Sequence, residues 1–240
     1  EVAAYYKQLT RFSSAFALLS DMAMFSLGGS LKFREKLSAR LGDMLSNLYI
    51  ASACLKRFER DGAQKEDLPV LKWAVETALY DLQQAMDGFL ANLPSRMLAA
   101  VLRKVIFPWG LTLKPASDRI GTQVARSLME LGPTRTRLTK GMFVSADETD
   151  PVGVLEPALK AMLETEPVEQ KLRKLGRDGK FKTITARERL AEALASGIIT
   201  QQEFDAVTRA RKLKRDVIMV DDFDMKMEHH DEQLLQRLIF

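Results

Sequence analysis

Apolar residues recur at intervals of three and four along most of the chain, the spacing of helices that bury one face. Four long stretches come first, and we predict that they pack as an antiparallel bundle with short links. They span about 3–26, 31–60, 67–93 and 95–106. Smaller helices are predicted at 117–130, 134–140, 151–164, 166–175, 185–196 and 200–215. Only 217–220 is a candidate strand, so the predicted fold class is all-α with at most one short strand pair.

The helical pattern breaks at the sequence Phe107-Pro108-Trp109-Gly110. We therefore expect a bundle over 1–107, a smaller helical subdomain packed on it over 108–224, and a tail over 225–240 that could form a loose amphipathic helix. The subdomain should end in a helical hairpin. Two capping boxes, Thr185 with Glu188 and Thr200 with Glu203, mark the starts of its two helices.

The second long stretch follows a glycine pair, Gly28-Gly29, which is typical of a helix end because glycine tolerates a left-handed backbone. Ser30 is then placed to cap the next helix. The predicted inward face of that helix is broad. It comprises Phe33, Leu37, Leu41, Met44, Leu45, Leu48, Ser52, Leu55 and Phe58. Arg40 lies on the shoulder of this face, where Asp43 is within reach of an ion pair.

The whole net charge of +4 resides in 31–60, which holds seven Lys/Arg and three acidic residues. One interpretation is an ion pair at a helix–helix contact and an otherwise solvated basic face. The other is contact with an anionic ligand or a second subunit, with Arg34, Lys36, Arg40 and Asp43 as candidates. Nucleic acid is not expected, because no long basic run is interleaved with aromatic residues.

The residue types that carry catalysis or bind metals are scarce. Cys54 is the single cysteine, which excludes an internal disulfide and fits a reducing compartment. His229 and His230 are adjacent, so they point about 100° apart on a helix and make a poor metal site. No nucleophilic triad or phosphate-binding glycine loop can be assembled. We predict no catalytic residue, no metal ligand and, for lack of a long uncharged apolar run, no transmembrane helix.

Several motifs nevertheless occur in an ordered series from Tyr6 to Asp224. They are Leu27–Asp43 continued by Met44–Phe58, Asp67-Leu68-Pro69, Val105–Pro108, Ala116–Asp118, Pro151–Glu156 and Val220–Asp224. This series resembles the carboxy-terminal region of bacterial long-chain acyl-CoA dehydrogenases of fatty-acid β-oxidation. Residues 225–240 match nothing in that region.

The resemblance implies a parent flavoenzyme that uses FAD to oxidise an acyl-CoA to a trans-2-enoyl-CoA and passes the electrons to an electron-transfer flavoprotein. In the family the catalytic base is a glutamate followed by glycine, on a core that precedes this region. No Glu-Gly pair occurs in the 240 residues, so the resemblance implies an extension that is inactive alone and binds no cofactor. The expected partner is an upstream catalytic core of the same polypeptide, since the chain begins with Glu1 rather than Met.

We further expect a homodimer in the cytoplasm, with peripheral contact at the inner membrane through the basic helix or the tail as a weaker expectation. Two alternatives stay open. The chain could be a free-standing helical adaptor, or its basic helix over 31–60 could bind acyl-CoA by itself.

Overall fold

The computed structural model of this chain describes residues 2–143, 145, 147, 150, 152–183 and 185–219. Contacts divide it into two compact units, with the boundary between Lys140 and Gly141. The first unit contains α1 (Val2–Leu27), η1 (Gly28–Phe33), α2 (Glu35–Arg60), η2 (Lys65–Asp67), α3 (Leu68–Asn92), α4 (Arg96–Ile106), α5 (Asp118–Met129) and α6 (Pro133–Thr139). The second contains α7 (Leu155–Arg177), α8 (Ala186–Ala195) and α9 (Gln201–Ile218). The described residues form no strand, and the all-α class is confirmed.

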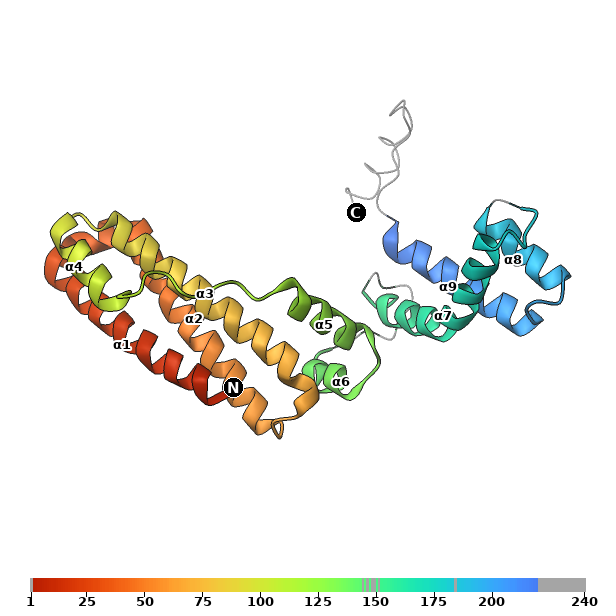
Figure 1. Cartoon of the computed structure of the whole chain (residues 1–240), viewed down its shortest axis with the longest axis horizontal. Coiled ribbons are helices and arrows are strands. Elements are labelled where there is room, and N and C mark those ends of the chain that lie inside the picture. The colour runs from red at the N-terminus through yellow and green to blue at the C-terminus, as the bar shows by residue number, and fades with distance from the viewer. Residues whose placement is uncertain are drawn as a thin grey trace, which may run out of the picture. The chain divides into compact units, whose positions relative to one another are not determined.

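The first unit is the predicted antiparallel bundle. α1, α2 and α3 run alternately up and down side by side, and the shorter α4 turns back along them (Figure 1). Their inward faces form one continuous core. Its fully buried members include Phe12, Leu19, Met44, Leu55, Val75, Leu79, Leu82, Met86 and Phe89. The core is held by the three long helices, with α2 and α3 in the most extensive contact.

The predicted domain boundary after residue 107 differs from the observed one because α5 and α6 belong to the first unit. A connecting segment over 107–117 runs from α4 along α3 to α5 (Figure 1). α5 packs on α3, and α6 lies at the corner where α2 passes into α3. The break in the helical pattern at Phe107 is thus a turn within the first unit, not a domain boundary.

The start of α2 differs from the prediction. Gly28 has a φ of 50°, as expected for a helix end, but η1 follows, so that α2 begins at Glu35. The Ser30 hydroxyl donates to the Leu27 carbonyl at 2.7 Å and caps no helix. Phe33 was predicted to face inward and is 77% exposed. The tighter period of a 3₁₀ helix shifts its phase relative to the α-helix that follows.

The second unit has its own small core beneath the predicted helical hairpin. Leu172 of α7, Leu190 and Ala193 of α8, Ile199 of the turn and Val207 of α9 are buried together. Both capping boxes are formed: Thr185 accepts from the Glu188 N–H, and Thr200 accepts from the Glu203 N–H, each at 3.2 Å. The hairpin prediction is confirmed.

Two details of the second unit were predicted wrongly. α7 is one helix that continues through Pro167, whereas two helices were expected. Val217 and Ile218 belong to α9, so the short strand at 217–220 does not form over the described residues; Val220 and the predicted tail lie outside them. α9 therefore extends beyond its predicted end at residue 215. It buries Val207 and Leu213, and α7 packs along it.

One helical stretch of the described chain, Val2–Phe33, is long and apolar enough to cross a membrane by length and composition. The sequence prediction was that none would be. Bundle helices can meet the same criterion, and this one buries Leu9, Phe12, Leu19 and Ala23 against the bundle.

Candidate interaction sites

The residues singled out from the sequence lie at the start of α2 and form no common site. Arg34, Lys36 and Asp43 are exposed, and within the described residues they make no side-chain hydrogen bond or ion pair. The predicted Arg40–Asp43 pair is also wrong. The Arg40 guanidinium instead donates to the Lys36 carbonyl at 3.1 Å. Helical side chains lean toward the preceding turn, which takes Arg40 away from a residue that follows it.

Arg40 has a packing role between helices instead. It is half-buried, and it lies against the backbone of α3 at Gly88. A Cβ atom at position 88 would be 3.0 Å from Arg40 Nε and 3.5 Å from its Cδ. The interpretation of this residue as part of a helix–helix contact therefore holds, although without the ion pair.

An open groove of about 580 Å³ runs between α1 and α2. Its lining is apolar or hydroxyl-bearing and includes Tyr6, Phe16, Leu45 and Tyr49. Leu45, predicted to be inward, is exposed here. The groove has no charged lining residue that could orient or activate a substrate.

A partly buried polar cluster joins α6 to the start of α3. The Asp67 carboxylate accepts from Arg137 Nε and Nη2, both at 2.7 Å, and from the Thr134 hydroxyl at 2.6 Å. Arg57 of α2 donates to the Arg137 carbonyl at 2.8 Å. The Arg137 guanidinium, helped by Thr134, holds the pKa of the Asp67 carboxyl below its usual range. Asp67 occupies the cap position of α3, but its side chain makes no cap hydrogen bond.

A second buried polar contact holds the connecting segment 107–117. The Gln83 side chain is 1% exposed and both ends of its amide are used. Gln83 Nε2 donates to the Leu113 carbonyl at 3.2 Å, and the Leu113 N–H donates to Gln83 Oε1 at 3.1 Å. We refer to this pair of hydrogen bonds as the Gln83 clamp. Nothing in the local pattern around Gln83 indicates its partner, which is 30 residues away.

Neither cluster resembles a catalytic centre. The Asp67 carboxylate is ion-paired and the Gln83 amide does not titrate, so neither offers a base to a substrate. Among the described residues no group of three or more His, Cys, Asp or Glu side chains could hold a metal. Burial raises the pKa of the half-buried Cys54 thiol, which lowers its reactivity. His229 and His230 lie outside the described residues.

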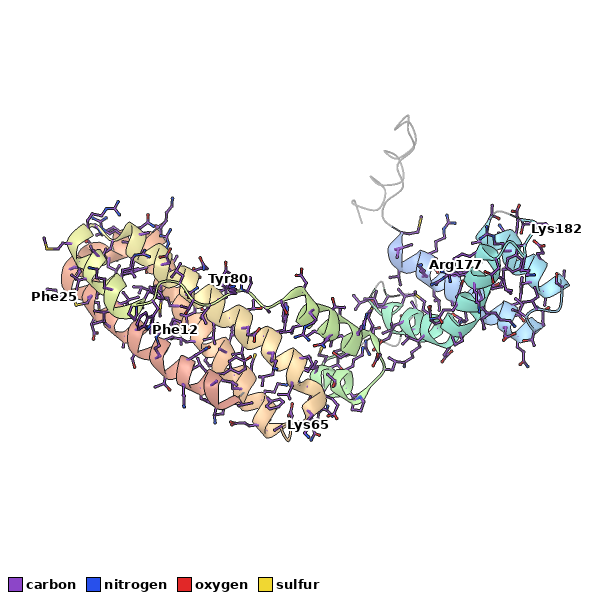
Figure 2. All side chains as sticks on the ribbon, viewed as in Figure 1. Phe12, Phe25, Lys65, Tyr80, Arg177 and Lys182 are labelled. Carbon is purple, nitrogen blue, oxygen red and sulfur yellow. The ribbon has the colours of Figure 1, made fainter. Side chains whose placement is uncertain are left out.

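The second unit contains a charged groove that the sequence prediction missed. It lies along the last turns of α7 and beside α8, with a volume of about 1010 Å³. The lining comprises Pro167, Gln170, Lys171, Arg173, Lys174, Gly176, Arg177 and Arg189. We call it the basic groove. Figure 2 labels Arg177 and, on the segment leading to α8, Lys182.

Comparison with protein families identifies the chain. A sequence model described as "Acyl-CoA dehydrogenase, C-terminal, bacterial type" matches residues 1–223. The chain belongs to this family. The assignment made from the ordered motifs between Tyr6 and Asp224 is confirmed. No solved structure matches the chain.

The description of the family names it as the C-terminal domain of acyl-CoA dehydrogenases. The family match covers both units, so the small hairpin unit is as much a part of this domain as the bundle. The Asp67 cluster joins α3 to α6, and the Gln83 clamp joins α3 to the connecting segment 107–117, so both are features of the first unit.

Proposed function

We propose that the chain is the non-catalytic C-terminal part of an FAD-dependent acyl-CoA dehydrogenase of fatty-acid β-oxidation. The observation that carries this proposal is the family match over 1–223 in a sequence that contains no Glu-Gly pair. The parent enzyme converts acyl-CoA to trans-2-enoyl-CoA and passes electrons to an electron-transfer flavoprotein. Its catalytic core, on the same polypeptide, supplies the base and the cofactor.

The residues of this chain do not fit a flavin. The described part is built from helices and their connections, and the sequence has no glycine-rich loop to hold a dinucleotide phosphate. No step of the oxidation is therefore assigned to these residues. Their proposed contribution is packing on the core and shaping the surface of the homodimeric enzyme in the cytoplasm.

The proposal is tested by purifying the chain alone and assaying it with palmitoyl-CoA and a dye that accepts electrons. We expect no flavin absorption and no dye reduction, while a polypeptide that also contains the upstream core shows both. Turnover by the chain alone would overturn the proposal. The coding sequence before Glu1 separates the adaptor alternative: a start codon directly there supports a free-standing adaptor, and a core with a Glu-Gly pair supports an enzyme domain.

A specific observation favours peripheral membrane contact as a second function. Where α1 passes through η1 into α2, Phe25 is 85% exposed and Phe33 is exposed beside Lys32, whose Nζ lies 4.8 Å from the ring centroid. Arg34 and Lys36 follow and are exposed. Exposed aromatic residues next to cations are the composition that enters the interface of an anionic bilayer. We call Phe25, Lys32, Phe33, Arg34 and Lys36 the bundle tip.

Sedimentation with phosphatidylglycerol vesicles tests this second function. The Phe25→Ser/Phe33→Ser variant should lose binding because the bilayer no longer gains apolar burial. Phe143→Ser is the matched control, since Phe143 is 91% exposed but lies in the other unit. Equal sedimentation of the two variants, or no sedimentation of the unaltered chain, would exclude the bundle tip as a membrane contact.

A further inference from the structure

The basic groove concentrates positive charge, and no carboxylate is among its lining residues. Five of its eight lining residues are cations, Lys171, Arg173, Lys174, Arg177 and Arg189, and none is acidic. Four of these cations come from α7 and the fifth from α8. Cations in the last turn of a helix are favoured by the helix dipole, but that effect does not explain Arg189, which is on another helix.

Hydrogen bonds hold part of this lining in position. Lys171 Nζ donates to the Ile198 carbonyl at 2.6 Å, and Arg189 Nε donates to the Thr183 carbonyl at 3.1 Å. Because Arg189 is fixed through Nε, its two terminal nitrogens keep their donors for another group. Lys174 and Arg177 have no side-chain hydrogen bond or ion pair within the described residues.

A glycine in α7 makes room for the cation from α8. A Cβ atom at Gly176 would be 2.9 Å from Arg189 Nη1 and 3.5 Å from its Cζ. Any side chain at position 176 would therefore require the flexible end of Arg189 to shift. Glycine is a poor helix former, so Gly176 lowers the stability of α7 relative to alanine. Its lack of a side chain lets Arg189 lie close to the α7 backbone.

The carboxylates near the groove are already occupied. Glu169 binds Arg211 through both oxygens, at 2.7 and 3.1 Å. Glu192 accepts from the Lys182 and Thr183 N–H groups, which hold the pKa of its carboxyl below the usual range. Glu188 belongs to the α8 capping box. Glu166 pairs with one lining cation, Arg173, at 3.7 Å. The charges of Arg173 and Lys171 also help to lower the pKa of Glu169 and of Glu203, respectively.

The last backbone carbonyls of α7 are hydrogen-bonded, so their partial negative charge would repel a bound anion only weakly. The N–H groups of Asp178, Gly179 and Lys180 donate to the Lys174, Gly176 and Leu175 carbonyls at 3.0, 3.3 and 3.0 Å. Five full charges exceed the partial charge of about half an electron at a helix C-terminus. The lining side chains therefore carry a net positive charge even after Arg173 is paired with Glu166.

We propose that the basic groove is a phosphate-binding site, which takes two or more phosphate groups carried by one soluble ligand or by neighbouring lipid headgroups. Arginine forks match phosphate oxygens in pairs, and lysines add charge without a fixed geometry. A volume of about 1010 Å³ is large enough for several phosphates or for a phosphate with an attached organic group. This proposal does not depend on the proposed parent enzyme.

Calorimetry of the full chain with inorganic pyrophosphate at low salt is the direct test. We expect binding that weakens as salt rises. The Lys174→Ala/Arg177→Ala variant should bind at least about tenfold more weakly, the factor that corresponds to about 1.4 kcal/mol. Both side chains are exposed and free of the bonds that hold the unit together. The Arg187→Ala/Lys212→Ala variant is the control, because it removes two exposed cations of the same unit that do not line the groove.

Gly176→Ala tests the geometry at constant charge. It should weaken pyrophosphate binding by displacing Arg189, while Gly42→Ala, in a part of α2 with open space around the glycine, should leave binding unchanged. Circular dichroism confirms that both variants are folded. Unchanged affinity in Gly176→Ala would overturn the part assigned to Arg189.

Vesicles distinguish a lipid phosphate from a soluble one. Binding to phosphatidylglycerol vesicles that is lost in Lys174→Ala/Arg177→Ala, without binding of pyrophosphate, supports a lipid headgroup; the reverse result supports a soluble diphosphate. The Phe25→Ser/Phe33→Ser variant leaves the groove intact, so a vesicle signal lost only in that variant belongs to the bundle tip and overturns the lipid arm. No binding of either probe, or equal binding by the groove and control variants, overturns the proposal.

Discussion

Replacing Gln83 with leucine should loosen the connecting segment 107–117 without disturbing the bundle core. Gln83 is fully buried on α3, and its amide is bonded at both ends to the backbone of Leu113. Leucine has a similar volume and would fill the same space. The substitution therefore removes two hydrogen bonds and creates no large cavity.

The expected cost follows from those two bonds. A hydrogen bond between uncharged groups contributes about 0.5–1.5 kcal/mol net, so the pair contributes about 1–3 kcal/mol. Leu113 is half-buried, which lets water reach its N–H and carbonyl once the clamp is gone. We therefore expect a loss in the lower half of that range. For a domain of this size it corresponds to roughly 2–8 °C in melting temperature.

Two measurements locate the effect. Urea unfolding reports the free energy of unfolding of the unit, and hydrogen exchange reports the protection of the Leu113 amide. The Leu113 N–H donates only to Gln83 among the described residues, so its exchange should accelerate by about tenfold or more. The amides in the middle of α2 and α3 should lose much less protection, because their bonds are within their own helices.

Gln84→Leu is the matched control, since Gln84 is the next residue on α3 and is exposed. The control should leave both the urea midpoint and the Leu113 exchange rate unchanged. Equal midpoints for the two variants, together with an unchanged Leu113 exchange rate, would show that the clamp does not hold the connecting segment.

Two further predictions concern other contacts of the first unit. Arg137→Ala should lower the free energy of unfolding at neutral pH and make it depend less on pH in acid. The pKa of Asp67 is lowered in the folded state, so the ionised carboxylate stabilises the fold above the ordinary carboxyl pKa. This contribution is lost as pH falls through the folded pKa, and without Arg137 most of it is absent. Urea midpoints between neutral and acidic pH check this, and an acid dependence equal to that of the unaltered chain would contradict it. Gly42→Ala should stabilise by about 0.5–1 kcal/mol, whereas Gly88→Ala should gain less, because its Cβ displaces Arg40. Equal unfolding free energies of the two alanine variants would refute the packing role of Arg40.

The sequence by itself determined the helices, their order and the family. Each helix follows from a local apolar period, and the capping boxes at Thr185 and Thr200 depend on residues only three positions apart. The family assignment rested on ordered motifs, which are also read along the chain. Local patterns fail where the backbone changes type, as at η1, where the 3₁₀ turn rotated Phe33 outward.

Only the tertiary structure decided which polar residues meet. Asp67 fits the pattern of a helix cap, yet it binds Arg137, 70 residues away, and Gln83 binds a backbone 30 residues away. The net charge pointed to the start of α2, but the basic groove lies in the second unit, whose sequence holds sixteen Lys/Arg and nineteen Asp/Glu. The groove forms because nearby carboxylates such as Glu169 bind other residues, and because Gly176 has no side chain that would contact Arg189. Lys171, Lys174 and Arg177 follow one face of α7 at intervals of three, a pattern present in the sequence. The contact of Arg189 with Gly176 joins residues with no periodic relation, so packing of whole helices must fix their positions before such partners can be known.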